Sequence, residues 1–389
     1  MKNWPMIKVA DEFDLQMGKT PARDNPAYWG GDQKWASIAD IGRSGMFLSD
    51  TKEAITQEAV SESGIKAVPP NTVVMSFKLS IGRTAITASR MYTNEAIMAF
   101  LPHDASAFDL HFLYHLFSNR NWSEGSNKAV KGVTLNKATL NVARIPKPDI
   151  SEQRAVASTL DKICDLIAKC DEQLVRLDQL VKSRFVEMFG GFGNPKHLPI
   201  CRVGEVIDAI DPHPSHRTPP TVKEGVPYVG VAECDRETGT IKFDRARIVA
   251  QEVLDEHKSR YAIEQGDFLI GKIGTIGKPF FLPSNQTYVL SANTVLVKPR
   301  RSLVEPQFLK IQFENQFIEH QIASNAKSTS QPAFGMNKVR DLRMLNPPLT
   351  LQREFAAFVT KTDKLAFAAR QRRDVAKQLY RAKIQEFFG

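Results

Sequence analysis

A long helical pattern occurs twice in this chain of 389 residues, at a constant offset of 199 positions. Residues 151–190 open on Ser-Glu-Gln-Arg and close on Glu-Met-Phe-Gly, whereas residues 350–389 open on Thr-Leu-Gln-Arg and close on Glu-Phe-Phe-Gly. A repeat of this length indicates that one structural unit has been duplicated. The chain is therefore predicted to contain two copies of a globular domain followed by a long helix.

The globular segments also match one another, but at offsets that drift between 193 and 201. Residues 35–40 match 228–233, residues 80–83 match 275–278, and residues 135–137 match 336–338. Loop insertions would cause such drift in two domains that keep one fold but meet different surfaces. The repeat divides the chain into a first globular domain, a central helix, a second globular domain and a C-terminal helix, at residues 1–150, 151–190, 191–349 and 350–389.

Composition limits the classes of protein that fit. The net charge of +9 favours a partner that carries phosphate groups, although an ordinary basic protein would have the same charge. The apolar runs are too short to span a bilayer and no charged-then-apolar leader opens the chain, so we expect a cytoplasmic protein without a membrane partner. The four cysteines lack CxxC spacing, and no metal site is expected.

The two long helices carry complementary apolar seams. In the first helix, apolar residues recur at alternating steps of four and three, which is typical of a coiled coil. We expect the two helices to form an intramolecular antiparallel coiled coil with pseudo-two-fold symmetry, rather than a dimerisation coil, because the chain supplies both partners. Ser151 is predicted to cap the first helix. The predicted seam residues are Val156, Leu160, Ile163, Ile167, Leu174, Leu177, Val181, Phe355, Val359, Ala366 and Tyr380.

Each globular domain is predicted to be mixed α/β. Apolar runs bounded by Gly, Pro and Asn predict strands at 72–77, 85–87 and 96–101, and again at 268–270, 279–282 and 294–297. One helix follows in each domain, at 108–119 and 306–323. A polar loop comes next, at 125–134 and 325–332. The predicted fold class is therefore mixed α+β, with two tandem domains and two long helices.

The polar loops and the glycine-containing turns offer ammonium, amide and hydroxyl groups together. Such groups contact phosphates and base edges in protein–DNA complexes, although they also occur on ordinary surface loops. We expect additive phosphate contacts from both domains. The candidate DNA-binding residues are Lys78, Arg83, Lys128, Lys131 and Thr134 in the first domain and Arg217, Lys272, Lys278, Lys327, Ser328, Thr329 and Gln331 in the second.

Three segments resemble catalytic or cofactor motifs only in part. Residues 189–193 (Phe-Gly-Gly-Phe-Gly) follow a helix rather than a strand, so a helix C-cap and linker is the better interpretation. Residues 346–349 (Asn-Pro-Pro-Leu) have Leu349 where an adenine methyltransferase needs an aromatic side chain. Residues 271–278 miss the phosphate-loop spacing by one residue, and Pro279 stands where Ser or Thr would bind magnesium. We therefore predict no catalytic, cofactor-binding or metal-binding residues in this chain.

The twice-repeated order of these segments resembles the specificity subunit of type I restriction–modification systems. The resemblance lies in the Gln-Arg helix starts behind proline turns, the Phe-Gly helix ends, the Ile-Gly pairs, and the loops that lead to Leu135-Asn136-Lys137 and Met336-Asn337-Lys338. It covers essentially the whole chain, but no single motif in it is specific. It implies two target-recognition domains, each reading half of a split double-stranded DNA site.

The resemblance also implies partners. Two modification subunits would dock on the helices and bind S-adenosylmethionine, and restriction subunits would add ATP-driven and magnesium-dependent cleavage. The chain itself would be a non-catalytic subunit. Two other interpretations remain open: a DNA methyltransferase with a fused recognition domain, and a coiled-coil scaffold that does not bind DNA.

Overall fold

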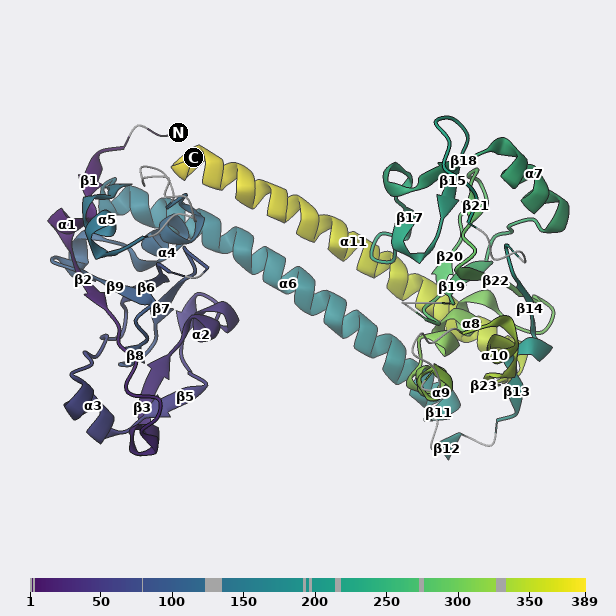
Figure 1. Cartoon of the computed structure of the whole chain (residues 1–389), viewed down its shortest axis with the longest axis horizontal. Coiled ribbons are helices and arrows are strands. Elements are labelled where there is room, and N and C mark those ends of the chain that lie inside the picture. The colour runs from purple at the N-terminus through teal and green to yellow at the C-terminus, as the bar shows by residue number, and fades with distance from the viewer. Residues whose placement is uncertain are drawn as a thin grey trace. The chain divides into compact units, whose positions relative to one another are not determined.

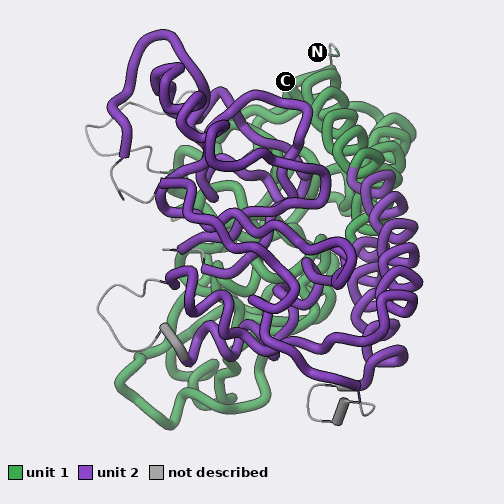
Figure 2. The backbone as a smooth tube through the Cα atoms, turned by 90° about the vertical axis from the view of Figure 1, so that its right-hand side faces the viewer, with its two compact units in different colours: residues 1–171, 371–389 green, residues 172–370 purple. Residues whose placement is uncertain are grey.

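The computed structural model describes residues 2, 4–78, 80–122, 135–191, 194–195, 198–213, 218–272, 276–326 and 334–389 (Figure 1). The chain divides into two compact units, Met1–Asp171 with Gln371–Gly389 and Glu172–Arg370 (Figure 2). The long helices are α6 (Ile150–Phe189) and α11 (Leu349–Phe388), each of 40 residues. Their bounds differ by one residue from the predicted 151–190 and 350–389. Each compact unit contains one globular domain and about half of each long helix, a division that sequence periodicity did not predict.

Two sheets form the globular part of the first unit. The larger sheet has the strand order β2-β9-β6-β7-β4, and the smaller has the order β5-β3-β8. A short antiparallel pair, β1 with β10, joins the two ends of the domain. The strands are β1 (Met6–Lys8), β2 (Phe13–Met17), β3 (Trp29–Ala36), β4 (Phe47–Leu48), β5 (Glu53–Ile55), β6 (Val73–Ser76), β7 (Thr84–Thr87), β8 (Tyr92–Thr93), β9 (Ile97–Pro102) and β10 (Arg144–Pro146).

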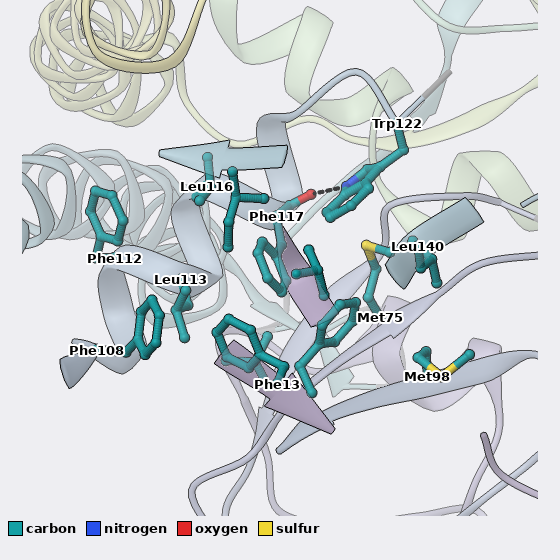
Figure 3. Close-up of a cluster of buried hydrophobic side chains, with 14 of the residues drawn as sticks. Phe13, Met75, Met98, Phe108, Phe112, Leu113, Leu116, Phe117, Trp122 and Leu140 are labelled. Atoms are coloured by element: carbon teal, nitrogen blue, oxygen red, sulfur yellow. Dashed lines mark hydrogen bonds between the residues drawn. The ribbon is translucent and has the colours of Figure 1, made fainter. Parts of the chain in front are cut away.

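Short helices cover the larger sheet of the first unit and carry much of its core. Phe112, Leu116 and Phe117 of α4 share one buried cluster with Phe13 and the strands below (Figure 3). The indole Nε1 of Trp122 donates to the Phe117 carbonyl at 2.9 Å and closes this cluster. The helices are α1 (Val9–Glu12), η1 (Pro26–Tyr28), α2 (Ile38–Arg43), α3 (Gln57–Ser63), η2 (Ala105–Ala107), α4 (Leu110–Asn119) and α5 (Lys137–Val142).

The second unit has two sheets of similar order, β14-β22-β19-β20 and β18-β15-β21. The first four strands of the larger sheet in the first unit have counterparts here, whereas its fifth strand, β4, has none among the strands of the described residues. In both small sheets, the central strand pairs antiparallel with one neighbour and parallel with the other. The strands are β11 (Gly190–Gly191), β12 (Asn194–Pro195), β13 (Ile200–Arg202), β14 (Ile207–Ile210), β15 (Val226–Val229), β16 (Cys234–Asp235), β17 (Thr240–Ile241), β18 (Arg247–Val249), β19 (Phe268–Gly271), β20 (Phe280–Phe281), β21 (Val289–Leu290), β22 (Thr294–Pro299) and β23 (Arg343–Leu345).

One predicted helix of the second domain is two helices. The helices here are η3 (Val203–Glu205), η4 (Val231–Glu233), η5 (Phe243–Arg245), α7 (Gln251–Arg260), α8 (Pro306–Phe313), α9 (Gln316–Ala326) and α10 (Met336–Asp341). The prediction of a single helix at 306–323 is wrong. The chain forms α8 and then α9, and Asn315 caps the start of α9. Its Oδ1 accepts from the Phe317 N–H at 2.9 Å and its carbonyl from Glu319 at 3.0 Å. An asparagine cap of this kind interrupts a helix without disturbing the apolar period.

Asp149, rather than Ser151, caps α6. The Oδ1 of Asp149 accepts from the Glu152 N–H at 2.9 Å and from the Ser151 hydroxyl at 2.5 Å. The prediction of a Ser151 cap is therefore wrong by two positions, because the aspartate carboxylate accepts the exposed N–H of the first turn.

A buried glutamine anchors the start of each long helix. The Gln153 amide accepts from the Asp109 N–H at 2.9 Å and donates to the carbonyls of Ala107 and Pro148 at 3.0 and 2.9 Å. Gln352 accepts from the Glu305 N–H at 2.9 Å and donates to the Pro347 carbonyl at 2.8 Å. Each glutamine thus joins a long helix to the first residue before α4 or α8. The Gln-Arg pairs of the sequence mark these two joints.

The helix pair is antiparallel. In the first unit, Phe387 shares a core with Val156 near the start of α6, while Arg373 pairs with Asp171 further along at 3.2 Å. In the second unit, Phe185 packs on Phe355 with ring centroids 5.6 Å apart. All the seam residues predicted from the sequence are buried or half-buried. Arg373, which interrupts the apolar pattern, is accommodated through its ion pair with Asp171.

Candidate nucleic-acid interface

A glycine turn with the same geometry occurs in both domains. Gly82 and Gly277 have φ values of +86° and +72°, in the left-handed region that favours glycine. The N–H of Gly82 donates to the Ser76 carbonyl at 2.9 Å, and that of Gly277 to the Gly271 carbonyl at 3.3 Å. The next residue in each domain, Arg83 or Lys278, is exposed. The two predicted DNA-contacting cations therefore occupy equivalent positions in the repeat.

Each glycine turn lies beside the segment that follows the central strand of the small sheet. The Arg83 guanidinium lies against Gly42 of α2, where an added Cβ would collide with it. In the second domain, the guanidinium of Arg236, which follows η4 and the short strand β16, donates to the Lys278 carbonyl at 3.1 Å. The structure thus brings together two segments that the sequence matched separately.

An acidic side chain stabilises this second segment in both domains. Asp40 Oδ2 accepts from the Ser37 N–H at 2.8 Å, and Glu233 Oε2 accepts from the Gly230 N–H at 2.7 Å. Burial alone would raise the pKa of Asp40, but hydrogen bonds from Ser37 and from the Lys52 N–H, together with Arg43, hold it below its ordinary value. Sequence matching paired Asp40 with Glu233 but did not predict this role.

Lys78 lies on the exposed surface of the first domain. Its Nζ is 5.6 Å from the centroid of the Phe77 ring. Nearby, a hydrogen bond from Thr20, and to a smaller extent Lys78 and Arg23, lower the pKa of Glu95. Lys78 is therefore accessible to a phosphate, and the carboxylate of Glu95 lies near it.

Lys272 is placed differently from the prediction. Its side chain is buried, with Nζ 2.8 Å from Asp211 Oδ2 and 3.0 Å from the Ala292 carbonyl that accepts its hydrogen bond. A buried lysine that is already paired would lose both partners on turning to a phosphate. This arrangement favours a structural role at the end of β19 and does not fit the predicted phosphate contact.

The remaining candidate residues lie outside the described residues, and the structure does not place them. These are Lys128, Lys131, Thr134, Arg217, Lys327, Ser328, Thr329 and Gln331. Within the described ranges, no group of three or more His, Cys, Asp and Glu side chains is arranged to hold a metal ion. None of the helices described is both long enough and apolar enough to cross a membrane.

The fold and these sites define a class of tandem-repeat protein. Each of its two basic α/β domains packs against segments of two antiparallel helices. The chain belongs to the family described as the type I restriction modification DNA specificity domain. The family model matches residues 1–175 and 223–377.

Two curated relatives support this assignment. The chain is 29% identical over 195 residues to the type I restriction enzyme MjaIX specificity subunit of Methanocaldococcus jannaschii, a match that covers 49% of this chain and 45% of the relative. It is 26% identical over 176 residues to the EcoR124I/EcoR124II specificity subunit of Escherichia coli, covering 43% of each protein. The matched part therefore spans less than half of either relative.

Two solved structures share the fold. A type I restriction–modification S subunit from M. genitalium has a TM-score of 0.62 at 14% identity, with 100% of this chain and 96% of that chain covered. A chain from a study of complex assembly and conformational transition of a type I system has a TM-score of 0.59 at 16% identity, with 99% and 97% covered. At such low identity, these likenesses show the fold alone.

Proposed function

We propose that this chain recognises a bipartite double-stranded DNA site, with one half read by each domain. The observation that carries this proposal is the repetition of the domain, including the order of four strands in the larger sheet, the three-stranded smaller sheet, and the glycine turn beside a basic side chain. Two equivalent DNA-binding domains on one chain would fit a target site that has two separate halves. Arg83 and Lys278, at equivalent positions, are our leading phosphate contacts.

The long helices are proposed to dock two modification subunits, which restriction subunits would then join. Supporting this, both helices carry exposed apolar side chains away from their seam, including Val175, Leu180, Phe367 and Val375. Exposed apolar side chains on a helix are of the kind that a partner protein would cover. S-adenosylmethionine, ATP and magnesium would bind those partner subunits. This chain would position the partner subunits on DNA and would perform no chemistry itself.

Exchange of one domain tests the bipartite proposal. Residues 1–150 are replaced by the equivalent domain of a relative, and the chimera is expressed with the modification subunit. Long-read methylation mapping should then show a change in one half of the recognised site only. Altered bases in both halves would contradict independent reading, and the unaltered chain in the same host is the control.

Assays with purified protein separate the alternative functions. The chain alone should not transfer methyl groups to plasmid DNA, whereas the chain with its modification subunit should. Methyl transfer by the chain alone, abolished by Asn346→Ala, would identify a fused methyltransferase. A chain that binds the modification subunit but gives no sequence-specific methylation would be a scaffold.

A further inference from the structure

A polar hollow of about 470 Å³ opens on the second domain, beside the small sheet β18-β15-β21. Its volume is within the range of ordinary small-ligand sites, about 300–1,000 Å³. Lys272 and Lys278, the two predicted DNA-binding residues of this domain that the structure describes, do not line it. The residues that line it are Thr218, Tyr228, Gly230, Val231, Ala232, Glu233, Arg247, Ser291 and Asn293.

The floor of the hollow is held by hydrogen bonds within the domain. The Tyr228 hydroxyl accepts from the Ala292 N–H at 2.8 Å, and the Ser291 N–H donates to the Val229 carbonyl at 2.7 Å. Glu233, as described above, accepts from the Gly230 N–H. The polar groups of the floor therefore already have partners, which gives a ligand a preorganised surface to meet.

Arg247 and Asn293 are available to a ligand of the hollow. Arg247 and Asn293 are both exposed, and within the described part of the chain neither side chain makes a hydrogen bond or an ion pair. A guanidinium presents two parallel donors that match the O6 and N7 of guanine, and an amide presents a donor and an acceptor that match N6 and N7 of adenine. The chemistry of the pair suits purine edges in the major groove.

The first domain differs from the second at the position of Arg247. Strand pairing places Arg247 opposite Tyr228, and the equivalent pair in the first domain is Glu53 opposite Trp35. Glu53 is engaged by Arg23 through two hydrogen bonds of 2.6 and 3.1 Å, and the Arg23 guanidinium lies 3.8 Å from the centroid of a Trp29 ring. The repeat therefore keeps the sheet and changes its exposed chemistry, as expected where two domains read different sequences.

We propose that Arg247 and Asn293 determine the sequence specificity of the second domain by reading purine edges of its half-site. This inference rests on the proposed DNA-recognition function and assigns base readout to two particular residues. It differs from the phosphate contacts assigned to Lys278, because a base contact discriminates between sequences whereas a phosphate contact does not.

The test uses the complex of the full chain with its modification subunit. The variants are Arg247→Ala, Arg247→Lys and Asn293→Ala, and the matched control is Arg245→Ala. Arg245 is an exposed arginine two residues before Arg247 that does not line the hollow. Methylation mapping gives the base preference at each position, and binding to specific and nonspecific duplexes across a salt series gives the slope. Thermal melting checks that each variant is folded.

Arg247→Ala and Asn293→Ala should each reduce discrimination about 10- to 100-fold at one position of the second half-site and leave the first half-site unchanged. Arg247→Lys should restore only part of the discrimination, because an ammonium group keeps the charge and three N–H donors but lacks the fixed planar pair of guanidinium. Arg245→Ala should keep the full sequence preference.

Two results would overturn the inference while leaving the proposed function intact. The first is an unchanged base preference in all three variants. The second is an equal loss of affinity for specific and nonspecific DNA with a salt slope reduced by about one, which identifies a phosphate contact instead. Absence of any sequence preference in the unaltered complex would instead refute the proposed function on which the inference rests.

Discussion

At the scale of single residues, Gln153 and Gln352 show how a short sequence motif becomes a structural joint. Both amides are fully buried. Each holds main-chain groups that the end of a helix would otherwise leave without partners. The arginine that follows each glutamine is exposed, so the two residues of the Gln-Arg motif have separate roles.

Replacing Gln153 by Ala should lower the free energy of unfolding of the first unit by about 2–4 kcal/mol. The Asp109 N–H and two carbonyls would lose their partners inside the protein. A group left fully unsatisfied costs about 1–3 kcal/mol, and the total is smaller than three such costs because Ala107 and Asp109 are only half-buried and water can reach them. The effect is measured by urea unfolding, with hydrogen exchange of the α4 amides as the probe of the first unit. The matched control, Arg154→Ala, should change stability by less than about 0.5 kcal/mol. Equal stability of the two variants would contradict the proposed joint.

A second residue-scale feature is the histidine pair of the second unit. The rings of His213 and His257 are buried with their centroids 4.3 Å apart, and the Tyr261 hydroxyl contacts His257 Nδ1 at 2.8 Å. Burial, together with the neighbouring His213 and Arg260, lowers the pKa of His257 to about 4. The folded state therefore holds His257 in its neutral form.

The second unit should consequently lose stability as the pH falls from about 6.5 toward 4. Below the ordinary histidine pKa of about 6.5, the unfolded chain binds a proton that the folded chain excludes, so the unfolded state is favoured. The loss from His257 alone should approach 1.4 kcal/mol per pH unit across that window. Unfolding free energies at pH 7.5 and pH 5 measure it. His257→Asn should flatten the dependence, whereas substitution of the exposed His103 should not. An unchanged pH dependence in His257→Asn would exclude this group as the cause.

At the scale of secondary-structure elements, each long helix ends inside the core of a domain. In the first unit, the Phe387 ring stacks on the Trp4 ring with centroids 6.4 Å apart. The rings of Phe388 and Phe112 are in contact with centroids 5.6 Å apart. In the second unit, Phe189 at the end of α6 contacts Phe308 at 5.2 Å. The Phe-Gly ends that appear in the sequence as helix terminators therefore also complete the two hydrophobic cores.

Phe387→Ala should destabilise the first unit by about 3–5 kcal/mol, as expected for removal of a buried phenyl ring. The control on the same helix is Leu379→Ala, since Leu379 is 46% exposed and should contribute little. Differential scanning calorimetry that resolves the two units is the measurement. Phe189→Ala should produce the matching loss in the second unit. A first unit that melts normally without the Phe387 ring would show that α11 is not part of its core.

At the scale of the whole molecule, each long helix continues from one compact unit into the other. A helix of 40 residues is about 60 Å long, which exceeds the roughly 34 Å of one DNA turn. We expect the helices to set the distance between the two domains, and therefore the number of unread base pairs between half-sites.

Adding seven residues to both α6 and α11 should lengthen that unread spacer by about three base pairs. Seven residues preserve the seam and extend a helix by about 10 Å, which corresponds to three steps of about 3.4 Å along DNA. Methylation mapping of the lengthened protein gives the spacer directly. Insertions of two residues serve as the control, because they rotate the seam out of register and should reduce activity. A fully active heptad variant with its original spacer would mean that other elements measure the distance.

Sequence alone determined the duplication, the bounds of both long helices to within one residue, and three strands of the larger sheet in each domain. It did not predict the central strands of the smaller sheets, β3 and β15. These features depend on local periodicity, because the residues that carry the signal are neighbours along the chain. The complementary seams also followed from periodicity, since a step of three and four residues places apolar side chains on one face of a helix.

Only the tertiary structure decided which groups meet across long separations in sequence. It assigned about half of each long helix to each compact unit, paired Lys272 with Asp211, and brought Arg247 and Asn293 to one hollow. No periodic pattern encodes these results, because burial and ion pairing depend on segments that become neighbours only after the chain has folded. For the same reason, Lys272 looks like a phosphate ligand in the sequence, whereas the structure places it in a buried ion pair.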